Sequence, residues 1–218
     1  MNKVCALVGF GAGNGLAIAK AFGADGHKLG LISRSRSKQE KPLQELAANG
    51  FDAQMFEADA ADPNSLGKAF AAIRDQVGDP SVLVYNAFAM RMATPSKTTP
   101  ENLVADFRIN VAGAVTAVRE VLPAMRAAKD GTIIFTGGGF AIDPVPQFAS
   151  IGVGKAALRN LAFSLAKELK ADGIRVGTVT IYGMVRAGTH FDPKKIAEVF
   201  LALYRQPADN FQSEIEYR

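Results

Sequence analysis

A glycine-rich stretch near the start of the chain is the first place where residue types and spacing suggest chemistry. It follows the apolar run 4–8 and precedes apolar residues at helical spacing. Its residues are Gly9, Gly11, Gly13, Asn14 and Gly15. A strand, a glycine turn and a helix together bind a dinucleotide pyrophosphate, because glycine admits phosphate to the backbone and the helix N-terminus favours negative charge. The stretch therefore predicts a nucleotide site, and a glycine turn without a ligand is the alternative.

The end of the second expected strand bears on which dinucleotide would bind. It reads Ile32-Ser33-Arg34-Ser35-Arg36 and contains no acidic residue. In such folds an acid at this place accepts a hydrogen bond from the ribose 2′-hydroxyl and favours NAD. Arg34 instead offers a planar fork suited to a 2′-phosphate, and Ser33 offers a hydroxyl donor. These residues favour NADP over NAD, unless the arginines are only solvated loop charges.

Strands and helices must alternate to place these residues at one edge of a sheet. Strands are expected at 4–8, 28–33, 51–57, 81–85, 132–136 and 174–181, with a short closing strand at 213–217. Helices are expected at 16–22, 42–48, 63–77, 100–128, 149–171 and 193–205. Alternation implies parallel pairing, and the continuously apolar strands imply helices on both faces. The prediction is one α/β domain over residues 1–218, a three-layer doubly wound parallel sheet, or Rossmann fold.

Composition excludes several classes of function. The 218 residues include 25 Lys and Arg against 21 Asp and Glu, a net charge of +4, without any run of like charges. Nucleic-acid binding is therefore not expected. No apolar run approaches the roughly 20 residues of a membrane span. Cys5 is the single cysteine, and with two histidines it fits no metal-ligand spacing. A reducing, cytoplasmic location is expected.

The glycine spacing G-x-x-x-G-x-G, at Gly9, Gly13 and Gly15, resembles that of the short-chain dehydrogenase/reductase family. Further motifs extend the resemblance over nearly the whole chain. Asp59 resembles the family's adenine-contacting aspartate, and Asn86-Ala87 resembles the family's Asn-Asn-Ala-Gly motif. Asn110 resembles the family's active-site asparagine, and Lys155 resembles the family's active-site lysine. The resemblance implies an oxidoreductase that transfers a hydride between NADP(H) and a small carbonyl compound, alcohol or activated alkene.

Two departures fall where the family carries its proton chemistry. The family has a Tyr-x-x-x-Lys pair, with a serine about 13 residues before the tyrosine. Here Ile151 stands four residues before Lys155, and Gly138 stands at the serine position. Isoleucine cannot donate a proton and glycine has no hydroxyl. The chain is therefore either an oxidoreductase with an atypical catalytic centre or an inactive NADP(H)-binding protein, such as a sensor or partner subunit. An interaction module that has lost the ligand is a third interpretation.

Tyr182 is the candidate replacement for the missing acid. The family's Pro-Gly beside the nicotinamide is Tyr182-Gly183 here, so the phenol is expected near the cofactor if the backbone follows the family. Aromatic packing is the alternative role. The predicted catalytic residues are therefore Asn110, Lys155 and Tyr182. The segment 184–192 is short, which predicts an open site without a lid.

The resemblance also implies an oligomer. In relatives, the two long helices, here 100–128 and 149–171, form the dimer face. Apolar residues expected on their exposed sides are Ala114, Val118, Leu158 and Phe163. A homodimer or homotetramer is expected.

Overall fold

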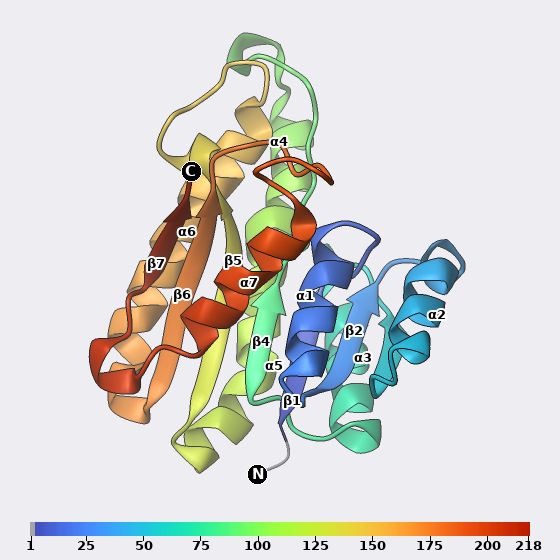
Figure 1. Ribbon diagram of the computed structural model, residues 1–218. Helices are drawn as coiled ribbons and strands as arrows, with labels where there is room; N and C mark the ends of the chain where they lie inside the picture. Colours follow the sequence, from blue (N-terminus) through green and yellow to red (C-terminus); the bar gives the residue numbers. More distant parts are fainter. Residues whose placement is uncertain (1–2) are drawn as a thin grey trace.

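The computed structural model describes residues 3–218, which form one parallel sheet of seven strands with helices on both faces (Figure 1). The sheet order is β3-β2-β1-β4-β5-β6-β7. The strands are β1 (Val4–Val8), β2 (Lys28–Ser33), β3 (Ala53–Glu57), β4 (Val82–Tyr85), β5 (Gly131–Gly138), β6 (Ile174–Ile181) and β7 (Glu214–Tyr217). The helices are α1 (Asn14–Ala24), α2 (Glu40–Ala48), α3 (Pro63–Gln76), α4 (Pro100–Phe107), α5 (Gly113–Ala128), α6 (Ala149–Leu169) and α7 (Pro193–Tyr204). The expected doubly wound fold is confirmed.

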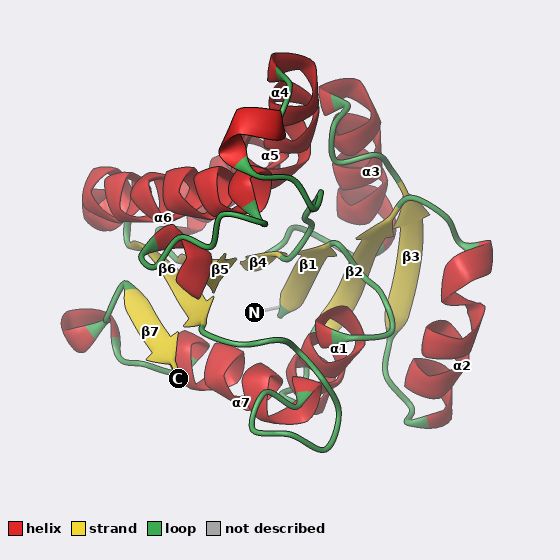
Figure 2. Ribbon diagram, turned by 90° about the horizontal axis from the view of Figure 1, so that it is seen from above, coloured by secondary structure: helices red, strands yellow, loops and turns green. Residues whose placement is uncertain are grey.

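Two apolar cores lie on opposite faces of the sheet, as the view from above shows (Figure 2). Helices α3, α5 and α6 cover one face, where Phe70, Val121 and Leu158 belong to the buried cluster. Helices α1 and α7 cover the other, where Phe22 and Phe200 are buried. All five residues of β1 and all four of β4 are buried. This burial on both faces explains why the strands are continuously apolar.

Three helices begin where the sequence places a capping residue before proline. The side chains of Asp62, Thr99 and Asp192 accept hydrogen bonds from backbone N–H groups in the first turns of α3, α4 and α7, at 2.9, 3.2 and 2.9 Å. Proline follows each cap, where its missing N–H costs nothing. Helix α1 differs, because Gly13 precedes it and provides no side-chain cap. The Leu16 N–H donates to the Gly11 carbonyl at 2.8 Å, and among the described residues the N–H groups of Asn14 and Gly15 are left for another acceptor.

The expected continuous helix 100–128 is wrong in one respect, because a π-helical turn interrupts it at Arg108–Ala112. The buried Tyr85 hydroxyl donates a hydrogen bond to the Ile109 carbonyl within this turn. Just beyond it, a Cβ on Gly113 would overlap the carbonyl oxygen of Ala60. The turn thus brings the helix close to the end of β4, and such turns are frequent at functional sites.

The expected apolar dimer face is wrong for three of its four residues. Ala114, Val118 and Leu158 are buried in the core of this chain rather than exposed, and Phe163 is half-buried beside Arg159. An apolar stripe on a helix covering a sheet turns toward that sheet, so spacing alone does not reveal a second face. The exposed large apolar residues of this region are Val104, Phe107, Val115 and Val153. A homodimer or homotetramer stays a prediction.

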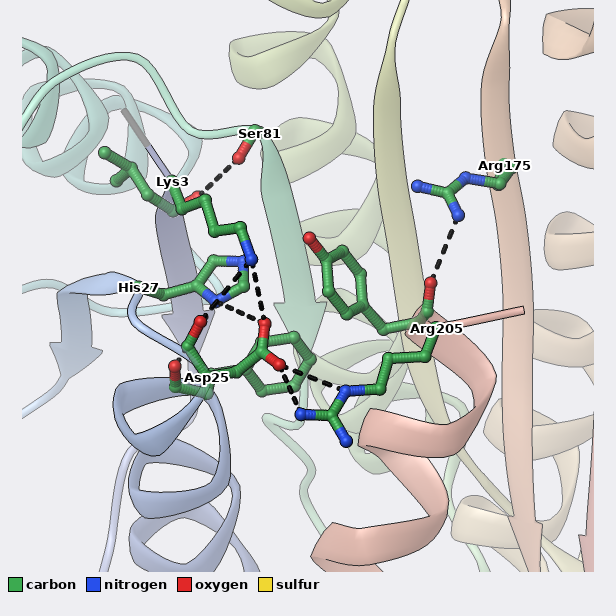
Figure 3. A network of polar contacts seen from close by, with 9 residues as sticks. Lys3, Asp25, His27, Ser81, Arg175 and Arg205 are labelled. Carbon is green, nitrogen blue, oxygen red and sulfur yellow. Dashed lines mark hydrogen bonds and ion pairs between the residues drawn. The ribbon is translucent and has the colours of Figure 1, made fainter. Parts of the chain in front are cut away.

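A polar cluster joins α1, β2 and the end of α7 at the edge of the sheet opposite its carboxyl ends (Figure 3). The Asp25 carboxylate, which lies just beyond α1, accepts hydrogen bonds from Arg205 and from Lys3, at 3.0 and 3.3 Å. Buried His27 places Nδ1 3.2 Å from the Phe22 carbonyl oxygen and 3.5 Å from the Asp25 carboxylate. Its Nε2 has no hydrogen-bond partner among the described residues. A neutral imidazole suits this site.

We expect His27 to make the protein less stable as the pH falls below about 6.5. Burial lowers the pKa of His27 from its usual 6.5, outweighing the nearby Asp25 charge. The unfolded chain therefore takes up a proton first, and the free energy of unfolding falls by at most about 1.4 kcal/mol per pH unit. Burial raises the pKa of Asp25, but the hydrogen bonds from Arg205 and Lys3 outweigh burial and lower the pKa below its usual 3.8. The stability that Asp25 contributes is therefore lost only at a more acidic pH than that at which His27 takes up its proton.

Urea unfolding at pH 7.5 and 5.5 tests this expectation. The wild-type protein and His190→Gln should both lose stability between these pH values, whereas His27→Gln should lose much less. An equal loss in all three proteins would contradict the role of His27.

Candidate functional site

Two glycines of the turn make close backbone contacts that a side chain would prevent, Gly9 with the segment after β4 and Gly15 within the turn itself. Gly9 has a positive φ of 90°, and a Cβ there would overlap the backbone N of Ala87. A Cβ on Gly15 would lie 2.9 Å from the Gly9 carbonyl oxygen. Gly13 faces open space, with no heavy atom within 4 Å of its Cβ position. The turn thus forms a cradle beside the uncapped start of α1, as anion binding requires.

A cavity of about 220 Å³ lies beside this turn, at the carboxyl ends of β1, β2 and β4. It brings together six of the residues predicted from the sequence: Gly9, Ser33, Arg34, Asp59, Asn86 and Ala87. Gly11, Gly13, Asn14 and Gly15 do not line it but belong to the adjoining turn and to the start of α1. Sequence reasoning missed one polar lining residue, Gln39. Its buried Oε1 has no hydrogen-bond partner among the described residues.

Arg34 and Arg36 differ sharply in their surroundings. Arg34 lines the cavity and makes no hydrogen bond or ion pair within residues 3–218. Arg36 is engaged, because its guanidinium donates to the Met55 carbonyl and its backbone N–H donates to the Glu57 carboxylate at 2.7 Å. The guanidinium of Arg34 is therefore available to bind an anion at the cavity, whereas that of Arg36 is bonded to β3.

A chain of hydrogen bonds connects the glycine turn to α6. Asn86 Nδ2 donates to the Gly9 carbonyl at 2.9 Å, and Thr136 Oγ1 donates to Asn86 Oδ1 at 2.9 Å. Lys155 Nζ then donates to the Thr136 carbonyl at 2.6 Å. Asn86 thereby fixes the turn relative to β4 and β5, and Lys155 is held at the same edge of the sheet. Asp59, at the cavity, accepts a bond from the Ala61 N–H at 2.9 Å.

Lys155 is a buried amine without a carboxylate partner. It is 7% exposed, and no ion pair to it exists among the described residues. Within residues 3–218, its one hydrogen-bond acceptor is the Thr136 carbonyl. Burial lowers the pKa of Lys155 to about 8, because removal from water penalises the charged amine. The amine can therefore take up and release a proton near neutral pH.

Asn110 lies on the π-helical turn and holds the segment after β4. Its Nδ2 donates to the Ala89 carbonyl at 3.0 Å, and its Oδ1 accepts from the Ala89 N–H at 2.7 Å. Helix α6 approaches this turn at Gly154, where a Cβ would lie 2.8 Å from Asn110 Cβ. Asn110 therefore fixes the backbone that leads away from Asn86.

Gly138 and Ile151 bring no hydroxyl to Lys155, although Gly138 lies against its side chain and Ile151 stands one helical turn before it. Gly138 ends β5 in an extended conformation, and a Cβ there would lie 3.5 Å from Lys155 Cγ. Ile151 is buried in the first turn of α6. The neighbouring Ser150 is also buried, and its hydroxyl has no partner among the described residues.

Tyr182 packs at the end of β6. Its N–H donates to the Tyr217 carbonyl at 2.9 Å, and the Arg218 guanidinium lies 3.8 Å from its ring centre. A Cβ on Gly139 would lie 2.6 Å from Tyr182 Cδ1, so the ring rests on that glycine. Burial, followed by the charge of Glu216, raises the pKa of Tyr182. A raised pKa moves the phenol away from proton exchange near neutral pH, which favours a packing role.

Residues 3–218 contain neither a candidate metal cluster nor a candidate membrane-spanning helix. No group of three or more His, Cys, Asp or Glu side chains there is placed to hold a metal ion. None of the helices in this range is long and apolar enough to cross a membrane.

Comparison with known proteins places the chain in a family. The family model for short chain dehydrogenases matches residues 3–194. Oxidoreductase asL5 of Sarocladium schorii is 31% identical over 180 residues, which cover 82% of this chain and 71% of the relative. A metagenomic short-chain oxidoreductase solved in complex with NADP has a TM-score of 0.89 at 29% identity, covering 98% of this chain and 96% of that one. A short-chain dehydrogenase from Rhodopseudomonas palustris has a TM-score of 0.90 at 26% identity, covering 100% and 99%. The chain therefore belongs to the short-chain dehydrogenase/reductase family of oxidoreductases.

Proposed function

We propose that this protein binds NADP(H) at the carboxyl edge of its sheet and transfers a hydride between this cofactor and a carbonyl compound, alcohol or activated alkene. The observation that carries the choice of cofactor is Arg34, which lines the cavity without a partner among the described residues, where an NAD-binding fold has an acid. The metagenomic neighbour solved with NADP supports the same choice. NAD is the less favoured cofactor.

The residues present fit such a dinucleotide. The cradle at Gly9 and Gly13, with the uncapped N-terminus of α1, would hold the pyrophosphate. Arg34 and Ser33 would bind the 2′-phosphate, and Asp59 would contact the adenine end. Further members of this proposed site are Gly11, Asn14, Gly15, Asn86, Ala87 and, toward the nicotinamide, Lys155. When bound, the nicotinamide would supply or accept the hydride.

We assign the role of proton donor in carbonyl reduction to Lys155. A general acid works best when its pKa lies near the working pH, and Lys155 at about 8 meets this condition where Tyr182 does not. In reduction, its ammonium would give a proton to the carbonyl oxygen and become the neutral amine, which burial favours. Asn110 would act as a positioning residue through Ala89. Tyr182 would pack beneath Arg218.

The second candidate function is a catalytically inactive NADP(H)-binding protein, favoured by Gly138 and Ile151 in place of hydroxyl-bearing residues. Both functions require the cofactor, so binding alone does not separate them. Substrate-dependent oxidation of NADPH in a screen of ketones, aldehydes and enones does. Turnover supports the oxidoreductase, and binding without turnover of any compound supports the inactive protein.

Arg34→Leu is expected to weaken NADP binding by roughly 10–100-fold and to leave NAD binding nearly unchanged. A charge-assisted hydrogen bond contributes about 1.5–3 kcal/mol, and 1.4 kcal/mol corresponds to tenfold in affinity. Isothermal titration of the variant with both dinucleotides measures the difference. Arg36→Leu is the matched control, because its guanidinium already binds Met55, and its preference for NADP should persist. An unchanged NADP affinity in Arg34→Leu, or an equal loss for both dinucleotides, would contradict the proposed cofactor site.

A further inference from the structure

A short turn between β2 and α2 places Gln39 beside the candidate cofactor site. Residues Ser37–Gln39 form this turn, which is a single turn of 3-10 helix. The Gln39 N–H donates to the Arg36 carbonyl at 2.8 Å, and the Arg36 N–H in turn donates to the Glu57 carboxylate at 2.7 Å. The backbone of Gln39 is therefore held in place relative to β3 by contacts within the chain.

The Gln39 side chain extends from this turn to the glycine turn. It lines the cavity of about 220 Å³ together with Ser33 and Arg34, which stand at the end of β2 and just after it. On its other side, its Oε1 atom lies 3.8 Å from the position that a Cβ on Gly11 would occupy. A ligand that contacts both Arg34 and the glycine turn would therefore lie against the amide of Gln39.

The Gln39 amide has hydrogen-bonding capacity that the protein leaves unused. Its Oε1 is buried and has no hydrogen-bond partner among the described residues. Buried polar atoms are ordinarily hydrogen-bonded, so an atom without a protein partner points to a bound group that completes the bond. Oε1 requires a donor, whereas Nε2 of the same amide carries two N–H donors. The amide is therefore suited to a ligand that has a donor next to an acceptor.

The adenosine ribose of NADP has such a pair of groups on adjacent carbons. The 2′-phosphate has acceptor oxygens, and the 3′-hydroxyl has an O–H donor. Arg34 has only donors, so it can bind the phosphate but cannot accept from the hydroxyl. Gln39 can do both with one amide. Because this amide carries no charge, it also leaves the field of Arg34 unopposed at the phosphate.

We propose that Gln39 acts with Arg34 to determine cofactor specificity, its Nε2 donating to the 2′-phosphate of NADP and its Oε1 accepting from the 3′-hydroxyl of the same ribose. This inference rests on the proposed cofactor site and adds a specificity-determining residue to it. A carboxylate in place of the amide would have nearly the same shape but would repel the phosphate.

Gln39→Glu therefore tests the proposal. Its affinity for NADP, measured by isothermal titration, should fall roughly 10–100-fold because the carboxylate repels the 2′-phosphate. Its affinity for NAD should not fall, since a carboxylate accepts hydrogen bonds from ribose hydroxyls. An NADP affinity equal to that of the wild-type protein, or an equal loss for both dinucleotides, would overturn the proposal.

Gln44→Glu is the matched control, because it makes the same change of charge at an exposed position on α2. It should keep the wild-type affinity for both dinucleotides. A loss of NADP affinity as large as that of Gln39→Glu would trace the effect to long-range charge rather than to contact, and would also overturn the proposal.

Gln39→Leu examines the bond to the hydroxyl, because leucine removes the amide but keeps much of its bulk. Affinity for NAD should fall about fivefold, since NAD has the same 3′-hydroxyl. Affinity for NADP should fall further, because the bond to the phosphate is charge-assisted. An unchanged NAD affinity would contradict the bond from the 3′-hydroxyl to Oε1.

These titrations measure binding without turnover, so they apply equally to an active and an inactive protein. If the wild-type protein binds neither dinucleotide, the proposed cofactor site fails, and this inference fails with it. If the wild-type protein prefers NADP and loses that preference in Arg34→Leu but not in Gln39→Glu, the cofactor site stands and the role of Gln39 alone is wrong.

Discussion

Returning the two missing hydroxyls, by Gly138→Ser with Ile151→Tyr, should raise the rate of carbonyl reduction by about 10²–10⁴-fold. Residue 151 lies four positions before Lys155 on α6, so a tyrosine there shares the helix face of the amine. Gly138 has an extended backbone that any residue adopts, and a Cβ there makes ordinary contact with Lys155. The serine hydroxyl would polarise the carbonyl, and the phenol would deliver the proton.

The rate of NADPH oxidation with a fixed ketone measures this gain. Gly138→Ala with Ile151→Phe is the matched control, because it adds similar bulk without either hydroxyl. It should remain at the wild-type rate. Equal rates in the two double variants, with both shown to be folded and to bind NADPH, would mean that the missing hydroxyls do not limit this centre.

Lys155→Met is the second change with a large expected effect. Methionine keeps most of the length of the side chain but removes the amine, so turnover should fall by about 10²–10⁴-fold. In the wild-type protein, the rate of reduction should fall as the pH rises through about 8, where the ammonium loses its proton. Lys167→Met, at an exposed position on the same helix, should keep both the rate and this pH profile.

A second measurement of Lys155 does not depend on turnover. Titration of ¹⁵N-labelled lysine side chains by NMR should show one amine with a pKa near 8, and this signal should be missing in Lys155→Met. A normal pKa near 10.5 for Lys155 would remove the reason for assigning it the proton.

Local signals account for what the sequence predicted correctly. Asp62, Thr99 and Asp192 each precede a proline and mark helix starts that the structure confirms, because capping involves only neighbouring residues. Alternation of strands and helices led to the parallel sheet because crossovers admit few arrangements. The glycine turn was also predictable, because its glycines meet local backbone requirements. At Gly9, a positive φ and close backbone contacts leave no space for a side chain.

Features that depend on distant contacts were not predictable. The π-helical turn 108–112 leaves the apolar spacing of its helix almost intact, and the hydrogen bond to Ile109 comes from Tyr85 on another element. Gln39 resembles a solvated residue before a helix, until the fold brings it to the cavity. The spacing of Ala114 and Val118 predicts an apolar stripe but does not tell which side of the helix faces the sheet, and both residues are buried against it.

A thermal-shift titration of the wild-type protein with NADP, NADPH, NAD and NADH tests the central claim most directly. A ligand at 100 times its Kd stabilises the folded state by about 2.7 kcal/mol, which raises the Tm of a domain of this size by roughly 5–10 °C. The proposed site predicts this rise with NADP and NADPH, and little or none with NAD and NADH at the same concentrations. No rise with any of the four would contradict dinucleotide binding, and an equal rise with all four would contradict the role of Arg34.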